Sequence, residues 1–141
     1  MRLLLVILFL CALHTLSGQS LKIVKIVDSN LFELEDGRLV KLAGVDAPQL
    51  SNPIPYFAGT AKEAVSYYKE ILLRRKVDVK TLAIIENKNY ELAYLTIQYP
   101  LEDLDLNQKF LENGFGKFFN NVDAGKKLIL LEAELNATEN Q

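Results

Sequence analysis

Apolar and polar residues alternate along the first part of the chain in the way that β-strands require. Apolar, β-branched runs separated by short polar segments predict strands over residues 21–27, 31–34 and 38–45. The separating segments, residues 28–30 and 35–37, contain the Asp, Ser, Asn and Gly residues that favour tight turns. The pattern therefore predicts an antiparallel meander at the start of the folded chain.

The period of the pattern changes after residue 56, where apolar side chains recur at helical spacing. This spacing predicts an amphipathic helix over residues 57–74. Strands are expected over residues 77–85 and 90–98, followed by a short helix over residues 104–113 that ends at Gly114. A last helix over residues 124–135 would be capped by Asp123. We expect it to bury an apolar stripe of Leu128, Leu131 and Leu135.

The expected elements follow the order β-β-β-α-β-β-α-α, with a helix between the third and fourth strands. This order is typical of the OB-fold. The pattern thus predicts a mainly β protein with helices (α+β), built as a five-stranded OB-fold barrel. One domain over residues 19–135 is expected, followed by a polar tail over residues 136–141.

Residues 1–18 have the three parts of a secretory signal peptide. Arg2 supplies positive charge, residues 3–13 form an apolar run too short to span a bilayer, and small or polar residues follow. We therefore expect these residues to be a signal peptide and the mature protein to be secreted, with no membrane segment. A membrane anchor is the alternative interpretation of the same run.

Removal of this leader limits the chemistry available to the mature chain. It takes away Cys11 and His14, the one cysteine and the one histidine of the sequence. Disulfides, zinc sites and Cys- or His-based catalysis are then excluded, and a bound metal would need oxygen ligands, as calcium or magnesium does. Of the 16 basic residues, 15 remain after Arg2 is lost, against 18 acidic ones. This acidic balance argues against tight binding of nucleic acid.

Several segments of the chain resemble the staphylococcal-nuclease (thermonuclease-like) domain. They are KIVDSNLFEL, DGRLVKLAGVDAPQ, ELAYLTI and DLNQKFLENGFGKF, and they follow one another in the family's order between residues 21 and 135. The resemblance implies an OB-fold and calcium-assisted hydrolysis of phosphodiesters. In that chemistry two aspartates hold the metal, a glutamate activates water, and two arginines grip the phosphate.

Carried over to this chain, the resemblance implies substitutions at the metal and water positions. The first metal aspartate falls on Asn30, which is neutral, while Asp28 matches the other acid of that turn. The second metal aspartate falls on Asp46 and is kept. The glutamate falls on Gln49, whose amide cannot act as a base at neutral pH. No acid lies between Asp46 and Glu63 that could replace it.

The phosphate-gripping arginines are replaced as well. The first falls on Lys41, which keeps the charge without the guanidinium fork, and the second falls on Tyr90. No arginine follows Arg75, so a shift of register cannot restore the second one. Loss of one such group typically lowers a rate by about 10²–10³. The vestigial positions are then Lys41, Gln49 and Tyr90 for catalysis, and Asp28, Asn30 and Asp46 for metal.

Each of these groups also has a structural interpretation. Asp46 can cap the Ala-Pro turn or hold a residual cation, Asp28 suits a turn, and Lys41 suits a solvated strand position. Tyr90 and Tyr94 can stack on bases, as aromatic residues do on OB-fold surfaces, or pack across strands.

The sequence therefore predicts a secreted, non-catalytic domain that needs no cofactor. It would act as a binding module for a protein or, weakly, for nucleic acid or a nucleotide. The alternative is a weak calcium-dependent extracellular endonuclease or phosphodiesterase that uses Asp28 and Asp46, and a structural domain without a ligand is a third interpretation. Asn136 opens an N-glycosylation sequon, which matters only in a eukaryotic host.

Overall fold

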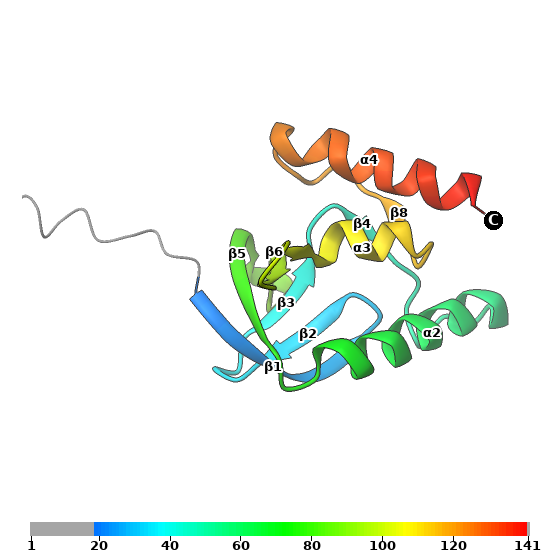
Figure 1. Ribbon diagram of the computed structural model, residues 1–141. Helices are drawn as coiled ribbons and strands as arrows, with labels where there is room; N and C mark the ends of the chain where they lie inside the picture. The colour runs from blue at the N-terminus through cyan, green and yellow to red at the C-terminus, as the bar shows by residue number, and fades with distance from the viewer. Residues whose placement is uncertain (1–18, 141) are drawn as a thin grey trace, which may run out of the picture.

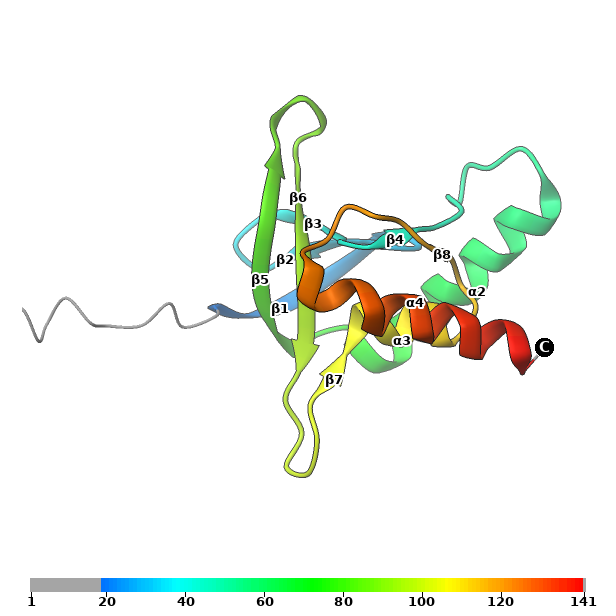
Figure 2. The same ribbon diagram turned by 90° about the horizontal axis from the view of Figure 1, so that it is seen from above.

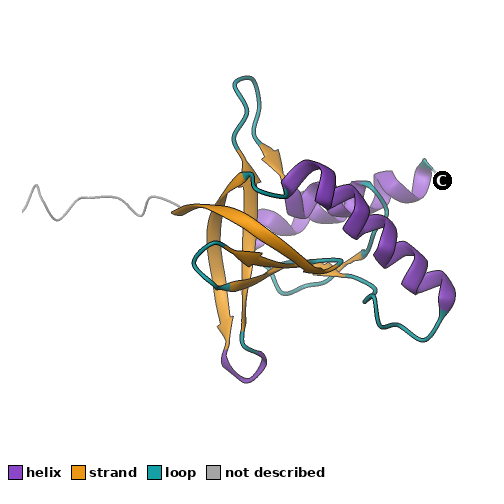
Figure 3. Ribbon diagram, turned by 90° about the horizontal axis from the view of Figure 1, so that it is seen from below, coloured by secondary structure: helices purple, strands orange, loops and turns teal. Residues whose placement is uncertain are grey.

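A computed structural model describes residues 19–140 of the protein (Figures 1 and 2). The predicted leader, residues 1–18, lies outside the described residues. The described chain forms a six-stranded sheet, a two-stranded sheet and helices packed to one side of them (Figure 3). None of the helices between residues 19 and 140 is long and apolar enough to cross a membrane.

The larger sheet curls back on itself. Its strand order is β3-β2-β1-β5-β6-β7, and β3 also pairs in parallel with β6. This arrangement confirms the predicted α+β class and is consistent with the OB-like fold. The strands are β1 (Gln19–Asp28), β2 (Leu31–Leu34), β3 (Leu39–Leu42), β4 (Val45–Asp46), β5 (Lys76–Ile85), β6 (Tyr90–Ile97), β7 (Leu104–Asp105) and β8 (Lys117–Phe118). The helices are α2 (Pro55–Leu72), α3 (Leu106–Glu112), α4 (Ala124–Glu139) and a 3-10 turn (Glu86–Lys88).

The strand predicted over residues 38–45 is divided in the structure. It breaks at Gly44, whose φ of 76° lies in the left-handed region that a residue with a Cβ rarely adopts. The chain leaves the large sheet there, and β4 pairs instead with β8. The first residues of the helix predicted over 104–113 likewise pair with β6 as β7. Asp105 then caps α3 by accepting a hydrogen bond from the Gln108 N–H at 3.0 Å.

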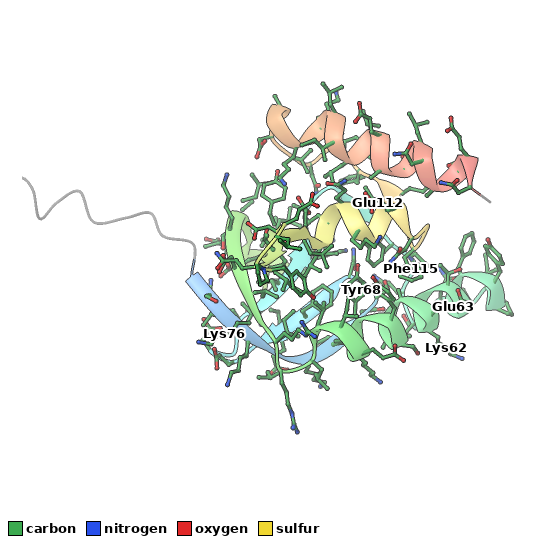
Figure 4. The ribbon with its side chains drawn as sticks, viewed as in Figure 1. Lys62, Glu63, Tyr68, Lys76, Glu112 and Phe115 are labelled. Carbon is green, nitrogen blue, oxygen red and sulfur yellow. The ribbon has the colours of Figure 1, made fainter. Side chains whose placement is uncertain are left out.

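An aromatic cluster joins the helices to the sheet. Tyr68 of α2 is fully buried and stacks on Phe110 of α3, with ring centroids 5.8 Å apart. It also meets Phe32 of β2 edge-on at 5.6 Å and Phe115 at 6.4 Å, the latter between α2 and α3 in Figure 4. Buried aromatic pairs of this geometry contribute about 0.5–1.5 kcal/mol each beyond their area. All four of these aromatic side chains lie in the segment that begins at Gln19.

The predicted core stripe of α4 is wrong. Leu128 and Leu135 are 69 % and 62 % exposed, and the helix buries Leu130, Ala133 and Ala137 instead. The reason is that α4 lies against α3 (Figure 1), where small side chains allow close approach. Leu130 fills the space beside Gly44. The capping prediction holds, because the Asp123 carboxylate accepts a hydrogen bond from the Lys126 N–H at 3.2 Å. The helix also runs to Glu139, past the predicted end at residue 135.

A buried asparagine ties α3 to the sheet. The Asn107 amide donates to the carbonyl of Ala43 at 2.7 Å and to that of Ala93 at 3.0 Å. Its side-chain oxygen accepts from the Leu95 N–H at 3.0 Å. Asn107 thus bonds to buried backbone groups of β6 and of the turn after β3.

We expect Asn107→Ala to lower the free energy of unfolding by about 2–5 kcal/mol, because it leaves buried backbone donors and acceptors unpaired. Denaturant unfolding followed by circular dichroism measures this change. Asn87→Ala, at an exposed position in the 3-10 turn, is the matched control and should change stability by less than about 0.5 kcal/mol. Equal effects of the two substitutions would show that the Asn107 bridge does not hold the barrel together.

Candidate functional site

The turn between β1 and β2 holds the loop that follows β4. One Asp28 carboxylate oxygen accepts hydrogen bonds from the Ser29 N–H at 2.7 Å and from the Leu50 N–H at 2.9 Å. The Ser29 hydroxyl donates to the carbonyl of Pro48 at 2.5 Å. Gln49 lies between these two anchors with its side chain exposed. Asp28 therefore orders the loop that carries the former base position.

Asn30 has a structural role that an aspartate could not fill. Its side chain is 4 % exposed, and its amide donates to the Val45 carbonyl at 3.2 Å. The backbone carbonyl of Asn30 accepts a hydrogen bond from the Leu42 N–H at 3.1 Å. An ionised carboxylate has no proton to donate, so it would meet the Val45 oxygen as one acceptor against another. The neutral residue at this position therefore suits the backbone around it.

Asp46 projects into solvent from a rigid backbone. Val45 and Asp46 pair with Phe118 and Lys117 across the β4–β8 ribbon. A Cβ at Gly116 would lie 2.6 Å from the Asp46 carbonyl oxygen, so only glycine permits this close approach. The Asp46 side chain itself is exposed. This aspartate is thus well placed to meet a ligand from solution.

Lys41 and Tyr90, the two positions that the resemblance assigns to arginines, lie against each other. The Lys41 ammonium of β3 is 5.5 Å from the centre of the Tyr90 ring of β6, within cation–π range. The parallel pairing of β3 and β6 brings these residues together. A planar, bidentate grip on phosphate, which needs guanidinium groups, is not available from this pair.

Arg38 is a guanidinium near this site that the sequence analysis did not single out. It donates to Asp36 at 2.8 Å and to Glu91 at 3.2 Å, and the Asp36 hydrogen bond raises the pKa of Arg38. The sequence feature that could have identified Arg38 is its position in the turn sequence DGR. A residue in this turn, beside β3, faces the start of β6. Two carboxylates already neutralise this guanidinium, so a phosphate would have to compete with both.

Tyr94 packs inside the protein. It is 3 % exposed, and its hydroxyl donates to an Asp123 carboxylate oxygen at 3.0 Å. Burial raises the pKa of this hydroxyl above its ordinary value. The Lys126 ammonium lies 5.5 Å from the ring centre. Stacking on a base requires an exposed ring face, which this placement of Tyr94 does not offer.

Asp46 and Tyr90 belong to the linings of two different hollows. The Asp46 hollow, of about 500 Å³, lies between the β4–β8 ribbon and the ends of α2 and α4. The Arg38 hollow, of about 570 Å³, includes Tyr90 and Glu91 in its lining. The Asp46 hollow is lined by residues that include Pro48, Tyr56, Phe57, Lys117 and Glu134.

Calcium does not fit the residues present. It prefers six to eight oxygen ligands, with carboxylates among them. Asn30 is neutral and turned to a backbone oxygen, and Asp28 uses one oxygen to hold the loop. Within residues 19–140, no three Asp, Glu, His or Cys side chains gather as a metal-binding group.

The predicted glycosylation sequon lies on a helix. Asn136 is exposed on α4, where a polar tail was expected, because the helix continues to Glu139. The Thr138 hydroxyl donates to the Glu134 carbonyl at 3.0 Å, within the same helix. Glycosylation of Asn136 stays a prediction.

A family model described as "Staphylococcal nuclease homologue" matches residues 39–141 of the chain. The match includes Lys41, Asp46, Gln49 and Tyr90, while Asp28 and Asn30 precede it. No curated protein matches the chain.

Restoring the family's aspartate at residue 30 should destabilise this protein. Asn30→Ala removes the hydrogen bond to Val45 and should lower the free energy of unfolding by about 1–3 kcal/mol. Asn30→Asp should lower it further at neutral pH, because this variant also buries a charge. Burial would raise the folded-state pKa of that acid above its unfolded value of about 3.9, so the loss should grow as the pH rises through that value. Urea unfolding of each variant at pH 3 and pH 7 measures this loss of stability. An Asp variant as stable as the wild type at pH 7 would disprove the structural role.

Proposed function

This chain belongs to the staphylococcal nuclease homologue family, and we propose that it is a member that binds a partner without cutting phosphodiesters. The observation that carries this proposal is the contact between Lys41 and Tyr90, the two positions that the resemblance assigns to the phosphate-gripping arginines. Gln49 adds to it, because an amide cannot activate water. Loss of several transition-state groups together leaves little rate enhancement.

The Asp46 hollow favours a protein partner. Asp46 and Glu134 are the carboxylates of its lining, and Lys117 is its cation. Tyr56 is 77 % exposed and Phe57 is also exposed, although large aromatic side chains usually find cover. An acidic hollow beside exposed rings suits a protein segment that carries both basic and apolar side chains, and it repels phosphates. The predicted leader over residues 1–18 supports the further proposal that this binding takes place outside the cell.

The alternative function is a weak calcium-dependent extracellular phosphodiesterase. Family membership fits it equally well, and Asp46 is exposed where a ligand could reach it. In that case Asp28 would have to serve the metal with its second carboxylate oxygen while the first holds the loop.

Purified protein should not cleave single-stranded DNA or RNA in the presence of calcium beyond the level of an Asp46→Ala variant. Gel-based digestion with both substrates, with and without a calcium chelator, measures this. A variant carrying Lys41→Arg, Gln49→Glu and Tyr90→Arg tests whether the missing groups limit activity, since each typically contributes about 10²–10³ in rate. Calcium-dependent turnover by the wild type that disappears in Asp46→Ala would establish the enzyme instead.

A panel of peptides that combine arginine or lysine with aromatic or aliphatic residues should bind at the Asp46 hollow. Amide chemical-shift changes should centre on residues 46–60 and 114–117, and Phe57→Ala should weaken binding by about tenfold. Tyr99→Ala, at another exposed aromatic position, is the matched control and should leave binding unchanged. Tighter, steeply salt-dependent binding of oligonucleotides would identify nucleic acid as the ligand.

A further inference from the structure

The outward face of α4 carries an apolar stripe. Successive residues of an α-helix turn by about 100°, so positions 128, 131 and 135 share one face. Leu128 and Leu135 are largely exposed, Leu131 is half-buried, and the opposite face packs on α3 (Figure 2). Apolar residues at this spacing are typical of a helix that packs on both sides.

The charges of α4 oppose its own dipole. Lys126 and Lys127 lie in the first turn, where anions are favoured, and Glu132, Glu134 and Glu139 lie in the second half, where cations are favoured. Asp105 compensates Lys126 by an ion pair within the chain. A helix of the same sequence running in the opposite direction would place glutamates beside the lysine end and lysines beside the glutamate end.

From this complementarity we propose that a second copy of this chain covers the stripe through an antiparallel α4–α4 contact. In heptad terms Leu128 and Leu135 occupy a positions and Ala124 and Leu131 occupy d positions. When Leu128 faces Leu131 of the partner subunit, Lys127 lies beside Glu134 of the partner subunit. The two-fold axis repeats this ion pair, so both copies gain it.

A parallel pairing fits the same charges less well. It would place Lys127 beside Glu132 of the partner subunit, but it would also place Glu134 beside Glu139 of the partner subunit, which is a repulsive pair, and it would align the helix dipoles. The antiparallel arrangement therefore follows from the positions of Lys127 and Glu134 relative to the stripe.

The contact is small. One helix face with three leucines per copy falls in the class of transient interfaces, so we expect a dimer that dissociates on dilution. Sedimentation equilibrium over a concentration series, on protein that begins at Gln19, should show monomer and dimer in exchange. Leu128→Glu should abolish the dimer without changing the thermal unfolding of the monomer, because this side chain is already exposed. Leu101→Glu, at a fully exposed loop position, is the control and should leave the dimer intact.

The charge-reversal variants test the direction of the helices. Lys127→Glu and Glu134→Lys should each weaken the dimer by about tenfold, and the two together should restore it. A monomer at every concentration, or a dimer that survives Leu128→Glu, would overturn the proposal. Tighter association of Glu134→Lys would also overturn it, since only a parallel pair gains from removing that glutamate.

Discussion

The hydrogen bonds of the Asn107 amide are the constraint on which the rest of the molecule depends. They join α3 to β6 and to the turn after β3, at the point where the sheet curls back on itself. That turn continues through Gly44 into β4, so the same bridge sets the position of Asp46. Gly44 also leaves room for the Leu130 side chain of α4. The Asn107 hydrogen bonds therefore influence the position of α4 as well.

Around this frame, three positions that the resemblance assigns to the family's chemistry make structural contacts. The amide of Asn30 bonds to a backbone carbonyl, the carboxylate of Asp28 orders the next loop, and Lys41 rests on Tyr90. Each contact satisfies a polar or charged group inside the protein and withdraws it from a ligand. Asp46 and Gln49, by contrast, have exposed side chains.

The surface beside this frame carries two further features. An acidic hollow with exposed aromatic rings adjoins Asp46, and α4 presents leucines to solvent with charges arranged against its own dipole. Both features have the composition of contact surfaces for protein, one for a basic segment and one for a copy of the same helix. The hollow and the helix are thus both surfaces at which we propose that this protein binds another protein chain.

The sequence by itself determined the local elements and the chemical inventory. Alternation predicted the strands, Asp123 marked the start of α4, Gly114 followed α3, and residue types alone showed that no arginine follows Arg75 and that no acid lies between Asp46 and Glu63. Only the tertiary structure decided which side of α4 is buried, that Arg38 is held by Asp36 and Glu91, and that Asp46 and Tyr90 line different hollows. The physical reason is that the spacing of apolar residues in a sequence shows which side of a helix is apolar, but not which other element packs against that side. A helix with leucines on one side and alanines on the other takes its orientation from the close approach that small side chains allow at α3, and contacts between residues distant in sequence exist only once the chain has folded.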